Sequence, residues 1–297
     1  MRISGFIHMI ELDSKIIGIV TYKKIEFFYF QNSQMNLFKR YLYQGNWIDL
    51  EYDEDKFVKK GRFLAHTISY IYTLKGLGKF CSITYYDKKS INNSLLSFIN
   101  GLGNVMFLDL EMTMPSYQFK GKGFKTEIIQ VGFIVVGANN EELCRYSNYV
   151  IPKIKMNFTK RVENFLGITQ SEFYSKAIQY KAFYEDFKSV LEDYNPVIVV
   201  YGKNDILVLN DSYIINEVPS LKDKTKFVNL CQIIKSHYDL RNDPGLFKMY
   251  KLFYDTDDIQ IHDAFVDCEV TRRVFDAFSE DLISNQKGEL IRKELES

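Results

Sequence analysis

The pattern of apolar residues changes once along the chain, near residue 103, and this change limits what the chain can fold into. Before it, short β-branched and aromatic runs such as 16–20, 25–30 and 63–74 follow one another without a long helical period. After it, short apolar runs alternate with segments of helical period. The first pattern is typical of an all-β unit and the second of an α/β unit.

We therefore expect two folding units and a connection between them. Residues 1–87 are predicted to form a small β-rich domain, a barrel or a sandwich, because no proline precedes residue 115 to interrupt its strands. Residues 88–103 are predicted to be a connecting helix or linker, in which a short helix at 88–100 is ended by Gly101 and Gly103. Residues 104–297 are predicted to be an α/β domain.

The first unit carries many aromatic residues and an excess of Lys and Arg over Asp and Glu. A small barrel of the OB or cold-shock type combines a basic groove with aromatic side chains on which bases stack. Aromatic residues also simply fill cores, and such a unit can mediate a homodimer, so all three roles stay open. The residues that would suit stacking are Phe27, Phe28, Tyr29, Tyr41, Tyr43, Tyr70 and Tyr72.

The remaining elements are expected from periodicity and from turn residues. Strands are expected at 80–86, 105–110, 127–136, 142–151 and 196–201, and another begins at 227. Helices are expected at 158–165, 177–194, 205–215, 246–253 and 262–278. Lys23–Lys24 and Gln31–Gln34 are interpreted as turns.

Composition narrows the class of protein. The 297 residues carry 38 Lys+Arg and 38 Asp+Glu, and zero net charge is mild evidence against extensive contact with a nucleic-acid backbone. The charge is uneven, however, because residues 1–103 are net basic and the rest is net acidic. The four cysteines form no C-x-x-C pair, which indicates reduced thiols. With no signal segment and no apolar stretch of membrane length, we expect a cytoplasmic protein without a membrane partner.

Two carboxylates occupy an otherwise apolar strand. Asp109 and Glu111 stand in the sequence MFLDLEMT, and alternation along a strand places both on one face. Two carboxylates so close on a core strand repel each other unless a cation lies between them. A solvated edge strand is the alternative, and the flanking apolar residues count against it.

Three further residues stand out later in the chain. Asp205 follows a buried apolar strand and a glycine turn, where it can also be a plain helix N-cap. His262 and Asp267 lie at the start of the last long helix, and the histidine has acidic neighbours at 257, 258, 263 and 267 that suit it to taking up a proton. If His262 precedes the helix, both side chains can face one pocket.

Taken in order, these residues resemble the motifs of the DEDDh (DnaQ-like) 3′–5′ exonucleases. The D-x-E motif is matched by Asp109 and Glu111, the second Asp by Asp205, and H-x-x-x-x-D by His262 and Asp267. Leu166-Gly167-Ile168-Thr169 is similar to a turn of the family, in which Leu166 replaces a usual Thr. The segment before Asp205 also departs from the family's usual His-Asn-Ala, which puts substrate contacts there in doubt. The resemblance covers about residues 104–280 and implies an RNase H-like mixed sheet flanked by helices.

The resemblance also implies a chemistry. Asp109, Glu111, Asp205 and Asp267 would hold two Mg²⁺ or Mn²⁺ ions, and His262 would be the general base that takes the proton from the attacking water. The substrate would be single-stranded RNA or DNA with a free 3′ end. RNA and short oligonucleotides are favoured because the later part looks like RNA-trimming, KapD-like members. Expected substrate contacts are Met112, Thr113, Met114 and Asn204.

Two points stay open at this level. The basic loop 119–125 could touch phosphate or base, or could be a solvated hairpin tip. A regulatory or nucleic-acid-binding protein that keeps the exonuclease fold with little catalysis is the alternative to an enzyme, and the intact set of five residues counts against it.

Overall fold

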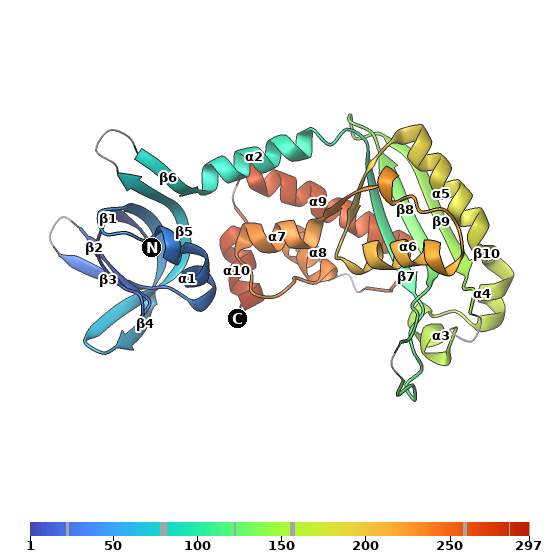
Figure 1. Cartoon of the computed structure of the whole chain (residues 1–297), viewed down its shortest axis with the longest axis horizontal. Helices are drawn as coiled ribbons and strands as arrows, with labels where there is room; N and C mark the ends of the chain where they lie inside the picture. Colours follow the sequence, from blue (N-terminus) through green and yellow to red (C-terminus); the bar gives the residue numbers. More distant parts are fainter. Residues whose placement is uncertain are drawn as a thin grey trace. The chain divides into compact units, whose positions relative to one another are not determined.

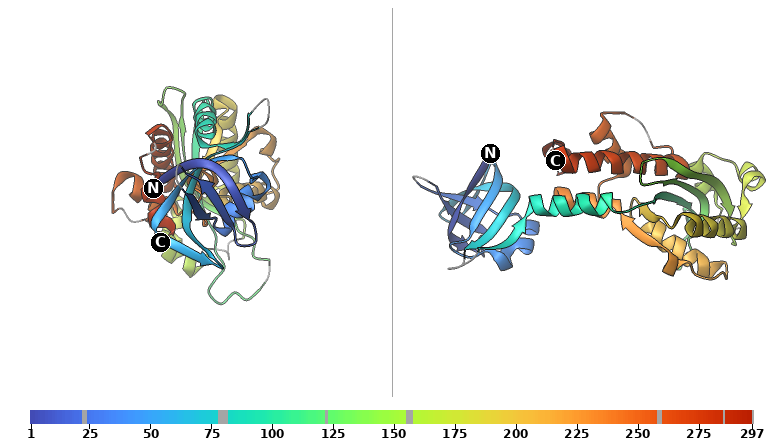
Figure 2. Two further views of the ribbon diagram at one scale, coloured as in Figure 1. Left: turned by 90° about the vertical axis from the view of Figure 1, so that its left-hand side faces the viewer. Right: turned by 90° about the horizontal axis from the view of Figure 1, so that it is seen from above.

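The chain divides into two compact units, Met1–Ser97 and Phe98–Ser297. Figures 1 and 2 show the structure, which is a computed structural model. It describes residues 1–21, 24–77, 82–121, 123–154, 158–257, 260–284 and 286–296. Some residues used in the expectations lie outside the described residues. They are Lys23 of the expected turn, the first residues of the strand expected at 80–86 with Cys81, Lys122 of the basic loop and Asp258 near His262. The division falls within helix α2 (Lys88–Asn100), whose bounds agree with the helix predicted there.

The first unit is a closed β-barrel with one short helix. Its sheet order is β3-β2-β1-β4-β5-β6, and a parallel pairing of β3 with β5 closes five of these strands into a barrel, so of the two expected architectures the barrel is confirmed and the sandwich is not. The elements are β1 (Arg2–Glu11), β2 (Ile16–Val20), β3 (Ile25–Tyr29), α1 (Asn32–Phe38), η1 (Lys39–Tyr41), β4 (Trp47–Lys60), β5 (Phe63–Leu77) and β6 (Ser82–Asp87).

Alternation along the strands separates the inside of the barrel from its outer face. Ile17 and Ile19 of β2 and Phe28 of β3 are fully buried in the interior core, whereas Val20 and Ile25 are exposed. The interpretation of Gln31–Gln34 as a turn was wrong, because these residues lead into α1. The Gln34 side chain accepts a hydrogen bond from the Gln31 N–H and donates one to the Ile68 carbonyl, so this polar residue anchors the helix.

The second unit is a six-stranded mixed sheet with helices. Its order is β10-β9-β8-β7-β11-β12. β7, β8 and β9 form an antiparallel meander, and β11 runs parallel to β7. The elements are β7 (Val105–Met112), β8 (Ile128–Val136), β9 (Glu142–Ile151), α3 (Lys160–Leu166), α4 (Gln170–Lys176), β10 (Ile178–Gln179), α5 (Tyr180–Tyr194), β11 (Val197–Val200), α6 (Asn204–Ile215), η3 (Lys222–Lys224), β12 (Lys226–Asn229), α7 (Leu230–Tyr238), α8 (Leu246–Tyr254), α9 (Ala264–Ser284) and α10 (Gly288–Glu296).

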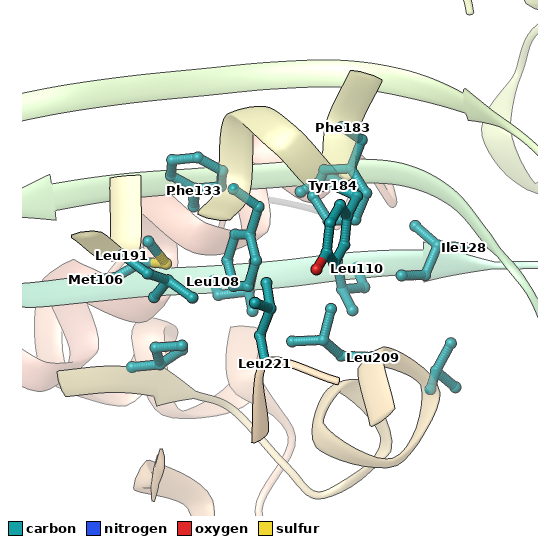
Figure 3. Close-up of a cluster of buried hydrophobic side chains, with 14 of the residues drawn as sticks. Met106, Leu108, Leu110, Ile128, Phe133, Phe183, Tyr184, Leu191, Leu209 and Leu221 are labelled. Carbon is teal, nitrogen blue, oxygen red and sulfur yellow. The ribbon is translucent and has the colours of Figure 1, made fainter. Parts of the chain in front are cut away.

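The two faces of β7 pack against different helices. Met106, Leu108 and Leu110 join a core that α5 and α6 complete (Figure 3). On the opposite face the Phe107 ring meets the Phe275 ring of α9, with the ring centroids 5.4 Å apart. The mixed sheet flanked by helices is thus the architecture expected. Among the described residues, no helix has both the length and the apolar composition needed to cross a membrane.

Several boundaries differ from the predicted ones for identifiable reasons. The helix expected from 177 starts at Tyr180, because Ile178 and Gln179 pair with β9 as β10. The helix expected from 262 starts at Ala264, because Asp263 caps it: the carboxylate accepts hydrogen bonds from the Phe265 and Val266 N–H groups. The strand that begins near 227 ends at Asn229, whose side chain caps α7.

A glycine allows α9 to approach the sheet. Gly132 of β8 pairs with Asp109 of β7, and a Cβ atom at this glycine would lie 2.3 Å from the backbone carbon and oxygen of Ala264. Neither partner is a flexible side chain. The first turn of α9 can therefore lie beside Asp109 only while residue 132 is glycine.

We predict that Gly132→Ala destabilises the protein by about 1–3 kcal/mol, because α9 must shift away from β8. The melting temperature should fall by about 2–4 °C per kcal/mol. Gly245→Ala is the matched control, since a Cβ there meets nothing within 4 Å. Equal melting temperatures for the two variants would contradict the close approach.

Candidate active site

The candidate site begins on the α9 face of β7. Leu108 and Leu110 point into the core on the α5 face, so alternation turns Asp109 and Glu111 toward α9, as the sequence predicted. Glu111 is only 8% exposed. The two carboxylates therefore lie beneath a helix, and the solvated edge strand considered above is excluded.

The strand β11 brings Asp205 to the same place. β11 runs parallel to β7, with Val199 beside Phe107, and the turn after it leads into α6 near the end of β7. The Asp205 carboxylate accepts a hydrogen bond of 3.2 Å from the Leu110 N–H. Asp205 is buried in the first turn of α6, so it is more than a surface helix cap.

The start of α9 supplies the last two predicted residues. His262 has a left-handed backbone with φ of +53°, a conformation that costs about 1–3 kcal/mol for a residue with a Cβ. Its ring stacks on Phe165 of α3 at a centroid distance of 4.2 Å. Asp267 lies in the first turn of α9 and is 3% exposed. The turn before the helix thus lets both side chains face one pocket.

Three of these side chains come close enough to share a cation. Ligand atoms of Glu111, His262 and Asp267 all lie within 4.8 Å of one another. One Asp267 oxygen, Oδ1, is buried without a hydrogen-bond partner, whereas Oδ2 accepts a bond of 2.6 Å from the Gln260 amide. A buried carboxylate oxygen without a donor is suited to a cation, so the donor set fits a hard divalent metal ion.

Electrostatics bring Asp109 and Asp205 into the same group. Burial raises the pKa of Asp109 well above its ordinary value, and the charges of Asp205, Asp267 and Glu111 raise it further. Burial, followed by Asp267 and Asp205, raises the pKa of Glu111 to about 8. Burial raises the pKa of Asp205 to about 6. The four carboxylates therefore repel one another in the protein without bound cations.

The expected substrate contacts separate into two pairs. Met112 and Asn204, which are the sequence neighbours of Glu111 and Asp205, line a cavity of about 580 Å³. The Thr113 hydroxyl instead accepts a hydrogen bond from the Glu127 N–H, and Met114 packs against a buried aromatic cluster. None of the five predicted catalytic residues lines the cavity.

The cavity is bounded by the basic loop and by α6. Phe124 and Lys125 of the loop 119–125 lie on one side, and Leu207 and Ile214 of α6 lie on another. Ile214 is 79% exposed and Leu207 is 53% exposed, which is unusual for large apolar side chains in one helix. The end of the loop therefore contributes to the cavity wall, while residues 119–121 and 123 are exposed, and contact of the loop with phosphate or base stays a prediction.

Sequence reasoning missed the residues that hold this site in place. Phe165 gives His262 a ring to stack on, and Gln260 binds Asp267. Gln130 of β8 donates a 2.7 Å hydrogen bond to Asp263, the cap of α9. Gln130 had a visible signal, because it is the one polar residue in the strand IIQVGFIVV. Phe165 had none, since it looks like any core aromatic residue.

Known proteins share sequence and fold with the second part of this chain. Residues 106–275 match the family model described as "RNase_T: Exonuclease". A curated relative, the "Probable 3'-5' exonuclease KapD" of Bacillus subtilis (strain 168), is 27% identical over 178 residues, which are 60% of this chain and 85% of the relative.

Two solved structures share the fold. One is a 3′-exonuclease described in a study of its 3′-end specific recognition of histone mRNA stem-loop, with TM-score 0.52, 16% identity, and coverage of 63% of this chain and 84% of that one. The other is the nuclease domain of 3'hExo, a DEDDh family member bound to rAMP, with TM-score 0.51, 16% identity, and coverage of 63% and 95%. Because the family model matches more than half of the chain, this protein belongs to the exonuclease family, as the order of its motifs predicted.

Proposed function

We propose that this chain is a divalent-metal-dependent 3′–5′ exonuclease that acts on single-stranded nucleic acid, with RNA favoured over DNA. The observation that carries the proposal is the gathering of four carboxylates, three of them buried, from three separate segments beside one imidazole. Such a group is unfavourable unless cations bind to it. The polarity follows the name of the curated relative, and the preference for RNA follows the mRNA and rAMP in the descriptions of the structural relatives.

The metal site would be built from Asp109, Glu111, Asp205 and Asp267. Oxygen-only ligands favour Mg²⁺ or Mn²⁺ over softer metals, and the unpartnered Asp267 oxygen is ready to accept a cation. When bound, a pair of such cations supplies an acidified water and stabilises charge on the leaving oxygen. The carboxylates themselves fix where the ions and the reacting phosphate lie.

His262 would act as the general base. Its ring lies next to Glu111 and Asp267, where it can take a proton from the attacking water and pass it to solvent. The stack on Phe165 and the left-handed backbone limit the positions that the ring can adopt. A base held in this way loses less entropy when the substrate arrives.

The cavity beside the carboxylates would receive a nucleoside of the substrate. Its volume is in the usual range for small-ligand pockets. Met112, Leu207 and Phe124 offer apolar contacts for a base, and Asn204 and Lys125 offer polar groups for sugar or phosphate. None of these groups forms a pair of hydrogen bonds that would select one base, so we expect the cavity to have little base specificity.

The direct test is hydrolysis of 3′-labelled and 5′-labelled RNA and DNA oligomers with Mg²⁺, Mn²⁺ or EDTA. We expect nucleotides to be released from the 3′ end, faster from RNA, and only with a metal ion. Asp205→Asn should lower kcat by at least about 100-fold, since it removes one of the charges that hold the ions. Wild-type protein that binds the oligomers but does not hydrolyse them with either metal would leave only a regulatory role.

The carboxylate repulsion predicts how the metal-free protein responds to pH. Glu111 has a raised pKa of about 8 in the folded protein against 4.5 as its ordinary value, so stability should fall as pH rises from about 4.5 to 8. Glu111→Gln should make the melting temperature in EDTA less dependent on pH and higher at pH 8. Glu192→Gln, an exposed control, should keep the wild-type slope, and a wild-type slope in Glu111→Gln would refute the repulsion.

The stack between Phe165 and His262 predicts a positioning role for Phe165. Phe165→Ala should lower kcat about 10-fold with little change in KM, because the base then samples unproductive positions. Phe165→Tyr should restore kcat, since it keeps a ring in the same place. Leu166→Ala, at the neighbouring position, controls for general loosening of α3. A loss of kcat in Phe165→Tyr equal to that in Phe165→Ala would contradict the role.

A further inference from the structure

The outer surface of the barrel carries an apolar patch that the proposed active site does not use. We define the barrel face as Phe6, Met9, Val20, Ile25, Phe27 and Phe63, which lie on β1, β2, β3 and β5. Phe6 and Val20 are each 44% exposed, and Ile25 is 39% exposed. Contiguous exposed apolar surface on a soluble domain marks a binding site more often than chance packing does.

Strand register shows that these side chains are neighbours. Phe6 pairs with Val20, and Val20 pairs with Ile25, so these three form one row across β1, β2 and β3. Two residues along β2, Met9 pairs with Gly18 and Gly18 pairs with Phe27, which forms a second row. Since alternate residues of a strand share a face, both rows lie on the outside of the barrel.

Aromatic rings stand at both ends of this face. Phe27 of β3 meets Phe63 of β5 with ring centroids 5.0 Å apart. At the other end, Phe6 meets the Trp47 ring of β4, also at 5.0 Å. Planar rings that are only partly covered offer surfaces on which bases can stack, and such stacking tolerates any sequence.

A glycine keeps the middle of the face shallow. A Cβ atom at Gly18 would lie 2.8 Å from the Met9 side chain and 2.9 Å from that of Ile25, and 3.2 Å from the Phe27 ring. The three side chains therefore converge over a position that has no side chain of its own. These side chains therefore form a continuous apolar surface between the Phe27–Phe63 pair and the Phe6–Trp47 pair.

The charges at the Phe63 end of this face are positive. From Lys56 to Tyr86 the sequence contains six Lys or Arg and no Asp or Glu. Within that stretch Lys60 pairs with Phe63 across β4 and β5, and the Arg62 guanidinium lies 5.1 Å from the centre of the Phe63 ring. Cations at the edge of an aromatic surface complement a ligand that has flat apolar groups joined by phosphates.

We infer that the barrel face binds single-stranded nucleic acid, with bases stacked on Phe27 and Phe63 and phosphates near Lys60 and Arg62. The inference deepens the proposed function and rests on it for the identity of the ligand. A second copy of the chain fits less well, because a twofold contact would bring the same cationic edge close to itself. A bound strand would stay tethered to the chain between cleavage events, which raises its local concentration.

Binding is tested on the full chain in EDTA, which prevents hydrolysis, with fluorescent single-stranded RNA and DNA of about 12 nucleotides. Phe27→Leu/Phe63→Leu keeps apolar side chains but removes both rings, and we expect Kd to rise about 10- to 100-fold. Lys60→Gln/Arg62→Gln should lower the slope of log Kd against log salt by about 1 to 1.5. Phe98→Leu, at an aromatic residue that is 49% exposed but outside the barrel face, should leave Kd unchanged. Melting temperatures confirm that the variants are folded.

The outcomes separate this inference from the proposed function. With Mg²⁺, the ring variants should raise KM for the 12-mer but not for a dinucleotide, which has too few bases to occupy both the face and the active site. A chain that hydrolyses no oligomer but loses binding in Phe27→Leu/Phe63→Leu refutes only the enzyme. Wild-type Kd in that variant overturns the barrel-face inference. A wild-type dimer, seen by sedimentation, that the same variant dissociates into monomers would also overturn it and would make the face a contact between copies.

Discussion

The mutual repulsion of buried carboxylates is the constraint on which the second unit depends. Asp109 and Glu111 come from β7, Asp205 from α6 and Asp267 from α9, and burial raises the pKa of each one. Packing them together opposes folding, because the negative charges lose their hydration and are brought close enough to repel one another. The packing of the rest of the unit has to offset this repulsion. Bound cations would remove the repulsion and so stabilise the folded protein.

The surrounding structure shows how they are held. Gly132 removes the side chain that would keep α9 away from β7. Asp263 caps α9 and is itself bound by Gln130, so the start of the helix is fixed to β8. The Leu110 N–H holds Asp205 from the other side. Backbone groups and the neutral amides of Gln130 and Gln260 make most of these contacts. Asp263 adds one further negative charge, which, after burial and the other carboxylates, also raises the pKa of Asp109 and Glu111.

The difference between the charged site residues and the contacts that hold them explains what the sequence could and could not predict. The sequence predicted the site residues because they are polar residues that interrupt apolar strands or stand at helix starts: Asp109, Glu111, Asp205, His262 and Asp267. It predicted the strands β7, β8 and β11 because they are apolar runs. The supporting contacts were not visible, because Phe165 and His262 are brought together by tertiary packing alone. In the barrel, β1 and β4 were missed, although Ile48, Leu50 and Tyr52 alternate with acidic residues in the first half of β4. Bulges in both strands shift the register, and the second half of β4 is almost wholly polar or exposed.

The distribution of charge along the chain has a physical reason in the same constraint. A unit that concentrates carboxylates repels a polyanionic substrate until cations bind, and Lys125 is the one basic residue among the described residues that line its cavity. If the barrel face binds the substrate as inferred, the acid-free stretch from Lys56 to Tyr86 supplies the additional attraction. Zero net charge is then the sum of two opposed requirements, one for metal ions and the other for phosphates.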